Sequence, residues 1–221
     1  MSSIEVYNVR KNYKKVNLLE NVEFKINENK IYILIGKEKT LIFELLNNRI
    51  SPSTGGILFD NEFIHEKESI IENFYYCSKN TLYPENMKCK NVFKWTKKFY
   101  EDFDMDYAVK LSEQFNLNIN GKVENLALEE EKILKIIVTL SSNANILIFD
   151  DPIEDLNEEN QEIFFKELFH TYNTKNNMII LGMKEFNGDL DNFKYINVVH
   201  INKGSNEEGE ENRNEEIINN K

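Results

Sequence analysis

Three short, almost wholly apolar segments constrain the fold of this chain most strongly. They are residues 31–35, 146–149 and 178–181, and each has the length of a strand. A strand without polar side chains must be covered on both faces, which is typical of parallel sheets enclosed by helices. Because segments with helical spacing separate these strands, the sequence predicts an α/β domain with a central, mainly parallel sheet.

Half-polar strands and a helical block accompany these buried strands. Residues 4–9 and 21–26 alternate apolar and polar side chains with a period of two, which is typical of half-exposed strands. Apolar positions recur at helical spacing in residues 91–99 and 107–115. We therefore expect a helical subdomain, at about residues 79–140, inserted between the two halves of the sheet.

The composition of the chain changes after residue 203. Residues 204–221 hold six Glu, two basic residues and almost nothing apolar beyond Ile217 and Ile218. Such a segment buries too little apolar surface to offset the entropy of ordering it. We therefore expect one domain, residues 1–203, followed by a disordered acidic tail, residues 204–221.

Charge and cysteine content disfavour several classes of protein. The formal net charge is −11 at pH 7, which argues against a protein that binds nucleic-acid phosphates. The apolar runs fall well short of the roughly 20 residues of a membrane span, and the N-terminus lacks the pattern of a signal peptide. Cys77 and Cys89 match no metal or redox spacing, as expected for a reducing compartment. We expect a cytoplasmic protein.

Several segments lie in the order of one known protein family. They are Tyr13 with residues 18–26, and then residues 51–60, 76–85, 92–117 and 146–156. Together they resemble the ATP-binding subunits of ABC transporters over about residues 3–203, and residues 92–117 look most like a group of Gram-positive exporter ATPases. The resemblance implies a P-loop NTPase-like ABC ATPase core with an antiparallel β N-terminal part and an inserted helical subdomain. It also implies ATP and Mg²⁺ as ligands, with Tyr13 stacked on the adenine.

The segment after the first buried strand stands where the family has its phosphate loop. A working loop reads G-x-x-x-x-G-K-[ST], in which glycines let backbone N–H groups wrap the phosphates, Lys neutralises them and the hydroxyl holds Mg²⁺. Here the segment is Gly36-Lys37-Glu38-Lys39-Thr40, with one glycine and about four residues fewer than the family loop. Lys39 or Lys37 and Thr40 still offer a charge and a hydroxyl, whereas Glu38 would repel phosphate. A weak phosphate site and a plain turn both stay open.

Two carboxylates follow the second buried strand. By the resemblance, Asp150 occupies the Walker B position and would contact the Mg²⁺ shell. Asp151 stands where the family has the Glu that polarises the attacking water, and its side chain is one methylene shorter. Misplacement by about 1 Å can cost ~100-fold in rate, so the resemblance implies a weakened catalytic position. A polar strand end followed by Pro152 is the alternative that stays open.

The family's signature segment, LSGGQ, maps to residues 126–130 when the family spacing is counted back from Asp150. Its Leu is retained, but Ala127 replaces the Ser that would bind the γ-phosphate, and Leu128 and Glu129 replace the two glycines. A run of three Glu that begins at Glu129 suits the N-terminus of a helix but opposes a triphosphate. This segment therefore predicts a capped, amphipathic helix.

Further positions differ from the family. Lys79 stands where the family has the Gln that links the nucleotide to the transmembrane partner, and Asn157 stands where it has an Asp. The His expected after the third buried strand is Met183 or Lys184, depending on a one-residue gap. These replacements imply weak binding of ATP and Mg²⁺ and lost or very weak hydrolysis.

The losses favour a subunit that depends on others. In the family two subunits pair head to tail, and each ATP lies between the phosphate loop of one and the signature segment of the other. Because both segments are altered here, each composite site would have one altered half. We expect a dimerising, degenerate exporter subunit that supports assembly or coupling of a transmembrane permease at the inner face of the membrane, beside an intact ATPase paralogue. A non-catalytic pseudo-ATPase that binds or regulates a partner, and an active ATPase with an atypical P-loop, stay open.

Overall fold

The computed structural model describes residues 2–27, 30–80, 83–175, 177–184 and 196–201. The chain forms two compact units: unit 1 comprises residues 1–71 and 180–221, and unit 2 comprises residues 72–179. The predicted helical subdomain, residues 79–140, falls within unit 2, and the predicted acidic tail, residues 204–221, lies outside the described residues. Among the described helices, none is long and apolar enough to cross a bilayer.

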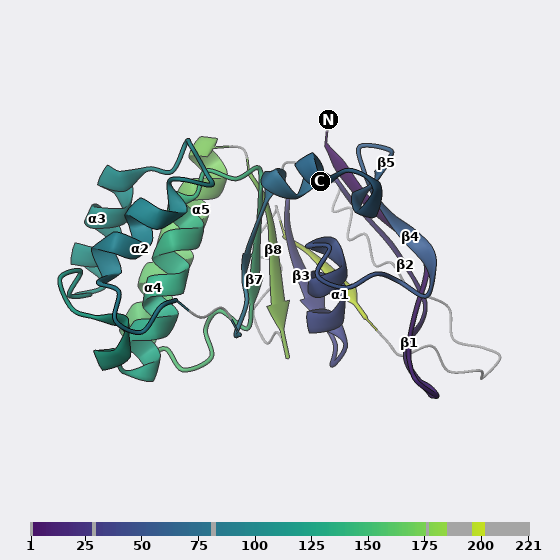
Figure 1. Ribbon diagram of the computed structural model, residues 1–221, viewed down its shortest axis with the longest axis horizontal. Helices are drawn as coiled ribbons and strands as arrows, with labels where there is room; N and C mark the ends of the chain where they lie inside the picture. The colour runs from purple at the N-terminus through teal and green to yellow at the C-terminus, as the bar shows by residue number, and fades with distance from the viewer. Residues whose placement is uncertain (1, 28–29, 81–82, 176, 185–195, 202–221) are drawn as a thin grey trace, which may run out of the picture. The chain divides into compact units, whose positions relative to one another are not determined.

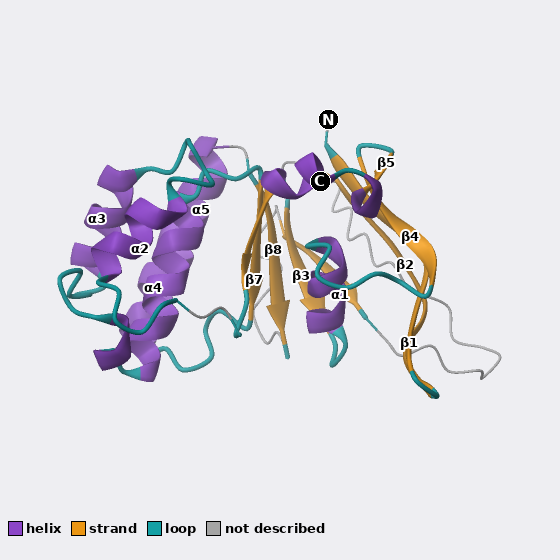
Figure 2. Ribbon diagram, viewed as in Figure 1, coloured by secondary structure: helices purple, strands orange, loops and turns teal. Residues whose placement is uncertain are grey.

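Unit 1 contains an antiparallel sheet with the strand order β2-β1-β4-β5, drawn in orange in Figure 2. Its strands are β1 (Ser3–Tyr13), β2 (Val16–Asn27), β4 (Thr54–Phe59) and β5 (Glu62–Phe63). The alternation predicted for residues 4–9 and 21–26 falls in β1 and β2. Short 3₁₀ turns follow at Ile64–Glu66 and Glu68–Asn73. The antiparallel β part implied by the resemblance is therefore confirmed.

A bulge in β1 lets both Val6 and Val9 face the core, although strict alternation would place them on opposite faces. Val6 pairs with Phe24 and Val9 pairs with Val22, so the register shifts between the two pairs. Asn8, with a φ of 46°, takes the left-handed backbone conformation that Asn tolerates better than most residues. Both valines are buried as a result.

A parallel strand pair and a short helix lie in the same unit. β3 (Ile31–Ile35) pairs in parallel with β9 (Ile196–His200) along its whole length, and α1 (Lys39–Leu46) follows β3. The first four residues of β3 are buried, as predicted for an apolar strand that is covered on both faces. The junction between β3 and α1 is the segment that the sequence aligns with a phosphate loop.

Unit 2 combines parallel strands with helices over its described residues (Figure 1). The strands β6 (Phe74–Cys77) and β7 (Ile146–Asp150) pair in parallel. The helices are α2 (Cys89–Thr96), α3 (Met105–Gln114), α4 (Leu128–Ser141) and α5 (Glu158–Lys175), with a 3₁₀ turn at Val123–Asn125. β8 (Met178–Met183) begins in unit 2 and ends in unit 1. The predicted mixture of parallel strands and helices is confirmed.

Helix α4 lies at the centre of the helical group. It contacts α2, α3, α5 and β6, and Figure 1 shows the helices gathered around it. Residues 133–141 of α4 are all buried, so every side of the helix is covered over this stretch. A helix that is mainly apolar all round is stable only when it is enclosed in this way.

Replacing the core residue Phe149 by Ala should destabilise the chain by about 3–5 kcal/mol, because the lost ring leaves a cavity. Phe149 is fully buried in β7 and lies edge-to-face against Phe164, with ring centroids 5.4 Å apart. Denaturant titration measures the change in the free energy of unfolding. Phe99→Ala is the matched control: Phe99 is 64% exposed, so its loss should change stability by less than about 1 kcal/mol. Equal losses in the two variants would contradict the described packing.

Candidate functional site

The segment between β3 and α1 in unit 1 is a short, closed turn. The Lys39 N–H donates to the Gly36 carbonyl at 3.5 Å, and the N–H groups of Leu41 and Ile42 both donate to the Glu38 carbonyl. Glu38 is the N-cap of α1, but its side chain makes no capping hydrogen bond. In a phosphate cradle, successive N–H groups converge instead on an anion outside the chain. This turn directs the Lys39 N–H into the chain itself.

Gly36 has a packing reason for being glycine. Its φ is 149°, and a Cβ built on it would lie 2.2 Å from the Ile201 carbonyl oxygen. The Ile201 N–H in turn donates to the Ile35 carbonyl at 2.7 Å. The close approach of these backbone segments therefore excludes a side chain at Gly36 without any bound phosphate.

The other candidate ligands of unit 1 differ in their exposure. Lys39 is buried, at 5% exposure, and its Cδ would lie 3.1 Å from a Cβ added to Gly182 in β8. Thr40 is half-buried in the first turn of α1, and Lys37 is exposed. Tyr13, at the end of β1, is 62% exposed, and the Lys14 ammonium lies 5.4 Å from the centre of its ring. The Tyr13 ring is thus open to solvent, whereas the Lys39 side chain is buried.

In unit 2 the two candidate carboxylates lie at the carboxyl end of β7. Asp150 is the last residue of the strand and is 1% exposed, and the Tyr76 hydroxyl donates to its Oδ2 at 3.2 Å. Asp151 is 5% exposed and has a φ of 46°, in the left-handed region that Asp tolerates better than most residues other than Gly and Asn. Among the described residues, no group of three or more His, Cys, Asp or Glu is placed to hold a metal ion.

Lys79 pairs directly with Asp151. Its ammonium lies 2.7 Å from Asp151 Oδ2 and also donates to Glu154 Oε2. Burial acts to lower the pKa of Lys79, but the hydrogen bonds to Asp151 and Glu154 and their negative charges outweigh it and raise the pKa well above its usual value. Two positions that the sequence analysis singled out separately are therefore partners in one ion pair.

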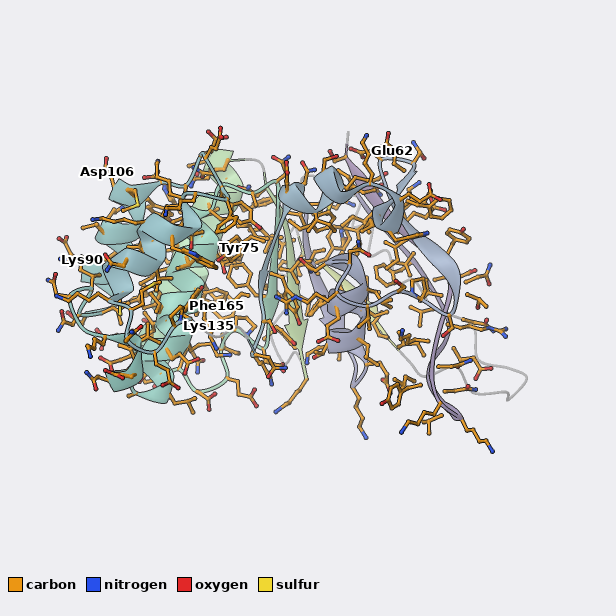
Figure 3. The ribbon with its side chains drawn as sticks, viewed as in Figure 1. Glu62, Tyr75, Lys90, Asp106, Lys135 and Phe165 are labelled. Carbon is orange, nitrogen blue, oxygen red and sulfur yellow. The ribbon has the colours of Figure 1, made fainter. Side chains whose placement is uncertain are left out.

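Two lysines of α4 hydrogen-bond to the loops that carry Lys79 and Asp151. The sequence analysis did not identify these lysines. Lys132 Nζ donates to the Asp151 carbonyl and Lys135 Nζ to the Lys79 carbonyl, each at 3.0 Å. Lys135, labelled in Figure 3, is buried and also pairs with Glu131 at 2.7 Å. A lysine within an apolar helix is rarely buried without partners, and this signal could have pointed to Lys135.

The segment aligned with the family signature forms the start of α4, as predicted. Glu130 Oε2 accepts a hydrogen bond from the Ala127 N–H at 2.8 Å, which caps the helix. Glu129 Oε1 accepts from the Asn157 N–H and from Asn160 Nδ2, each at 2.8 Å. These hydrogen bonds, that of the Asn157 N–H first, lower the pKa of Glu129. Glu129 thus joins the starts of α4 and α5.

The position expected for His lies at the end of β8. Met183 is the last residue of this strand and is buried, whereas Lys184 follows it and is exposed. Neither side chain is an imidazole, the group whose unperturbed pKa lies closest to neutral pH.

Comparisons with known proteins agree with the resemblance. The sequence model of the family described as ABC transporter matches residues 19–154. The phosphonates import ATP-binding protein PhnC of Fusobacterium nucleatum is 27% identical over 201 residues, which cover 80% of this chain and 80% of PhnC. The xylose import ATP-binding protein XylG of Thermoanaerobacter pseudethanolicus is 26% identical over 179 residues, which cover 72% of this chain and 35% of XylG. The chain thus spans about a third of XylG.

A solved structure shows the same fold. The structure of an ATP-binding subunit of an ABC transporter matches with a TM-score of 0.78 at 16% sequence identity. The match covers 91% of this chain and 86% of that chain. The α/β fold implied by the resemblance is therefore confirmed.

Replacing Glu129 by Gln should flatten the acid side of the stability profile. Because the folded-state pKa of Glu129 is lowered, its carboxylate contributes stability above its unfolded pKa of about 4.3, and that contribution is lost as the pH falls through the folded pKa. The free energy of unfolding, measured by denaturant at stepped pH between about 3 and 7, tests this. Glu101→Gln, in the exposed turn after α2, controls for the loss of one charge. If the free energy of unfolding falls equally steeply with acid pH in Glu129→Gln and in the wild type, the prediction is wrong.

Proposed function

The chain belongs to the ABC transporter ATP-binding family, and we propose that it is a degenerate subunit that supports assembly or coupling of a membrane transporter, with weak or absent ATP hydrolysis. The closed turn at residues 36–39 is the observation that carries this proposal. A triphosphate is held mainly by converging backbone N–H groups and one lysine, whereas here the Lys39 N–H bonds inside the turn and the Lys39 side chain is buried.

The geometry and the charge of the turn both support the proposal that ATP binds weakly. The Lys39 N–H is used inside the turn, and the Lys39 side chain is buried in unit 1. Glu38 adds a negative charge at the N-terminus of α1, where a phosphate would benefit from the helix dipole. The residues present therefore do not fit a triphosphate in the manner of a family phosphate loop.

The position of the Asp151 carboxylate is a separate reason to propose that hydrolysis is weak or absent. A group that polarises water needs an oxygen within hydrogen-bond reach of that water. One Asp151 oxygen faces the Lys79 ammonium at 2.7 Å, and the residue is 5% exposed. In its described arrangement Asp151 is engaged in an ion pair inside unit 2.

Partners follow from the composite sites of the family. The relatives are named as ATP-binding proteins of import systems, and a subunit of this kind works with a transmembrane permease. With its phosphate-loop and signature segments both altered, this chain needs an intact ATPase paralogue in the same dimer if the transporter is to hydrolyse ATP. We place the chain in the cytoplasm, at the inner face of the membrane through the permease.

A non-catalytic binding or regulatory module is the second candidate. Trp95 and Phe99, on one side of α2 and the turn after it, are 44% and 64% exposed, and their ring centroids lie 5.0 Å apart. Contiguous exposed apolar patches mark surfaces that bind a partner, and this pair of rings is the observation that favours such a surface here. Such a module would need no nucleotide at all.

Calorimetry should show weak or no binding of ATP–Mg²⁺, because the Lys39 N–H bonds inside the turn at residues 36–39 and the Lys39 side chain is buried. The full chain is titrated with ATP–Mg²⁺ and, in parallel, with ATP in the presence of EDTA. The Lys39→Ala variant is the control. Tight, magnesium-dependent binding that Lys39→Ala abolishes would contradict the proposal and restore a phosphate site at Lys39.

Purified chain should release phosphate from ATP–Mg²⁺ no faster than background. Losing one charge-stabilising group in such a site commonly costs ~100- to 1,000-fold, and several positions differ here. Asp151→Glu should not restore turnover, because the turn at residues 36–39 is unchanged. Asp150→Ala identifies contaminating ATPases, whose activity persists in that variant. Turnover that is present in the chain and lost in Asp150→Ala would establish an active ATPase with an atypical loop.

A further inference from the structure

We propose that Lys79 is a built-in cation, which holds the loops after β6 and β7 together and takes the place of a diffusible cation beside Asp151. Resting on the proposed function, this assigns Lys79 a positioning role in a subunit that keeps one loop arrangement without nucleotide. Lys79, Asp151 and the residues that contact them below all lie inside unit 2.

The topology of unit 2 brings the two loops to one edge. β6 and β7 are parallel and in register up to the pair Cys77–Phe149, so their carboxyl ends lie side by side. Lys79 follows the end of β6, and Asp151 follows the end of β7. The 2.7 Å contact between their charged groups thus joins two loops that are far apart in sequence.

The burial of Asp151 favours a cation close to its carboxylate. A carboxylate that is 5% exposed has lost most of its hydration, and an unpaired buried charge is strongly unfavourable. Glu154 brings a second negative charge to the same ammonium. Lys79 is 37% exposed, so its ammonium lies where a small solute can reach.

The neighbouring lysines of α4 contact the backbone of the two loops. Lys132 and Lys135 donate to the main-chain carbonyls of Asp151 and Lys79, so they fix the backbone of each loop. Lys79 meets the Asp151 carboxylate itself. Since α4 is buried over residues 133–141, it is a rigid support for both loops.

The backbone at Asp151 also needs an anchor. Its φ of 46° lies in the left-handed region, which Asp adopts more readily than most residues but which is still sparsely populated, and the surrounding contacts hold it there. The side chain is held by Lys79 and the carbonyl by Lys132. A tethered cation keeps these contacts at any ligand concentration, whereas a bound cation would stabilise the loops only in proportion to its occupancy.

Cation rescue of the full-length Lys79→Ala variant tests this role. We expect Lys79→Ala to lower the Tm by roughly 5 °C or more, because the ion pair between Lys79 and the buried Asp151 is lost. Ethylammonium chloride should restore at least half of that loss, whereas NaCl at the same ionic strength should not. The wild type should show no comparable gain in ethylammonium. Lys79→Arg, which keeps the cation, should melt within about 2 °C of the wild type.

Further variants separate this role from simple packing. Lys79→Met fills the space without a charge, so it should lose stability and show no ethylammonium rescue. Lys79→Ala combined with Asp151→Asn removes the carboxylate and should also show no rescue. Lys67→Ala is the matched control for an exposed pair: Lys67 and Glu62 lie 2.6 Å apart at 55% and 54% exposure, and its loss should change the Tm by less than about 2 °C.

Two results would overturn the inference. One is a Lys79→Ala variant that melts like the wild type, and the other is an ethylammonium effect that is equal in all variants. If Lys79→Ala does not fold in NaCl, refolding in ethylammonium but not in NaCl supports the proposal, and failure in both salts while Lys79→Met folds refutes it. No arm uses nucleotide, so an active ATPase in the phosphate assay would overturn the proposed function without deciding this experiment.

Discussion

The enclosure of α4 is the constraint on which the rest of unit 2 depends. The helix contacts α2, α3, α5 and β6, and residues 133–141 are buried on every side. A polar side chain in that stretch is shielded from water, so a partner within the protein stabilises it. Lys135 finds the Lys79 carbonyl, and Lys132, one turn earlier, finds the Asp151 carbonyl. These two lysines of α4 thus find their hydrogen-bond acceptors in the loops that follow β6 and β7.

The sequence predicts the strands well where one physical signal dominates. Residues 31–35 and 146–149 are apolar throughout, and they form the buried strands β3 and β7. A period-two pattern predicts a strand but does not fully predict which side chains face the core, because one bulged residue shifts the register. The bulge at Asn8 changes which side chains of β1 face the core, and only the pairing of β1 with β2 reveals it.

The candidate site was harder to predict because its residues act through contacts between distant segments. Alignment by spacing identifies Lys79 and Asp151 as unusual but cannot make them partners, since that requires the register of β6 against β7. Gly36 is the opposite case. Sequence motifs link its glycine to phosphate, whereas the structure supplies a sufficient reason in the Ile201 carbonyl. Local composition cannot distinguish these two reasons.

The charge balance beside Asp151 gives a physical reason for Lys79. Asp151 is 5% exposed, and a buried carboxylate is unfavourable unless a positive charge lies close to it. Lys79 supplies that charge at 2.7 Å from within the chain. Under our proposal, Lys79 therefore keeps a positive charge beside Asp151 whether or not a ligand is bound.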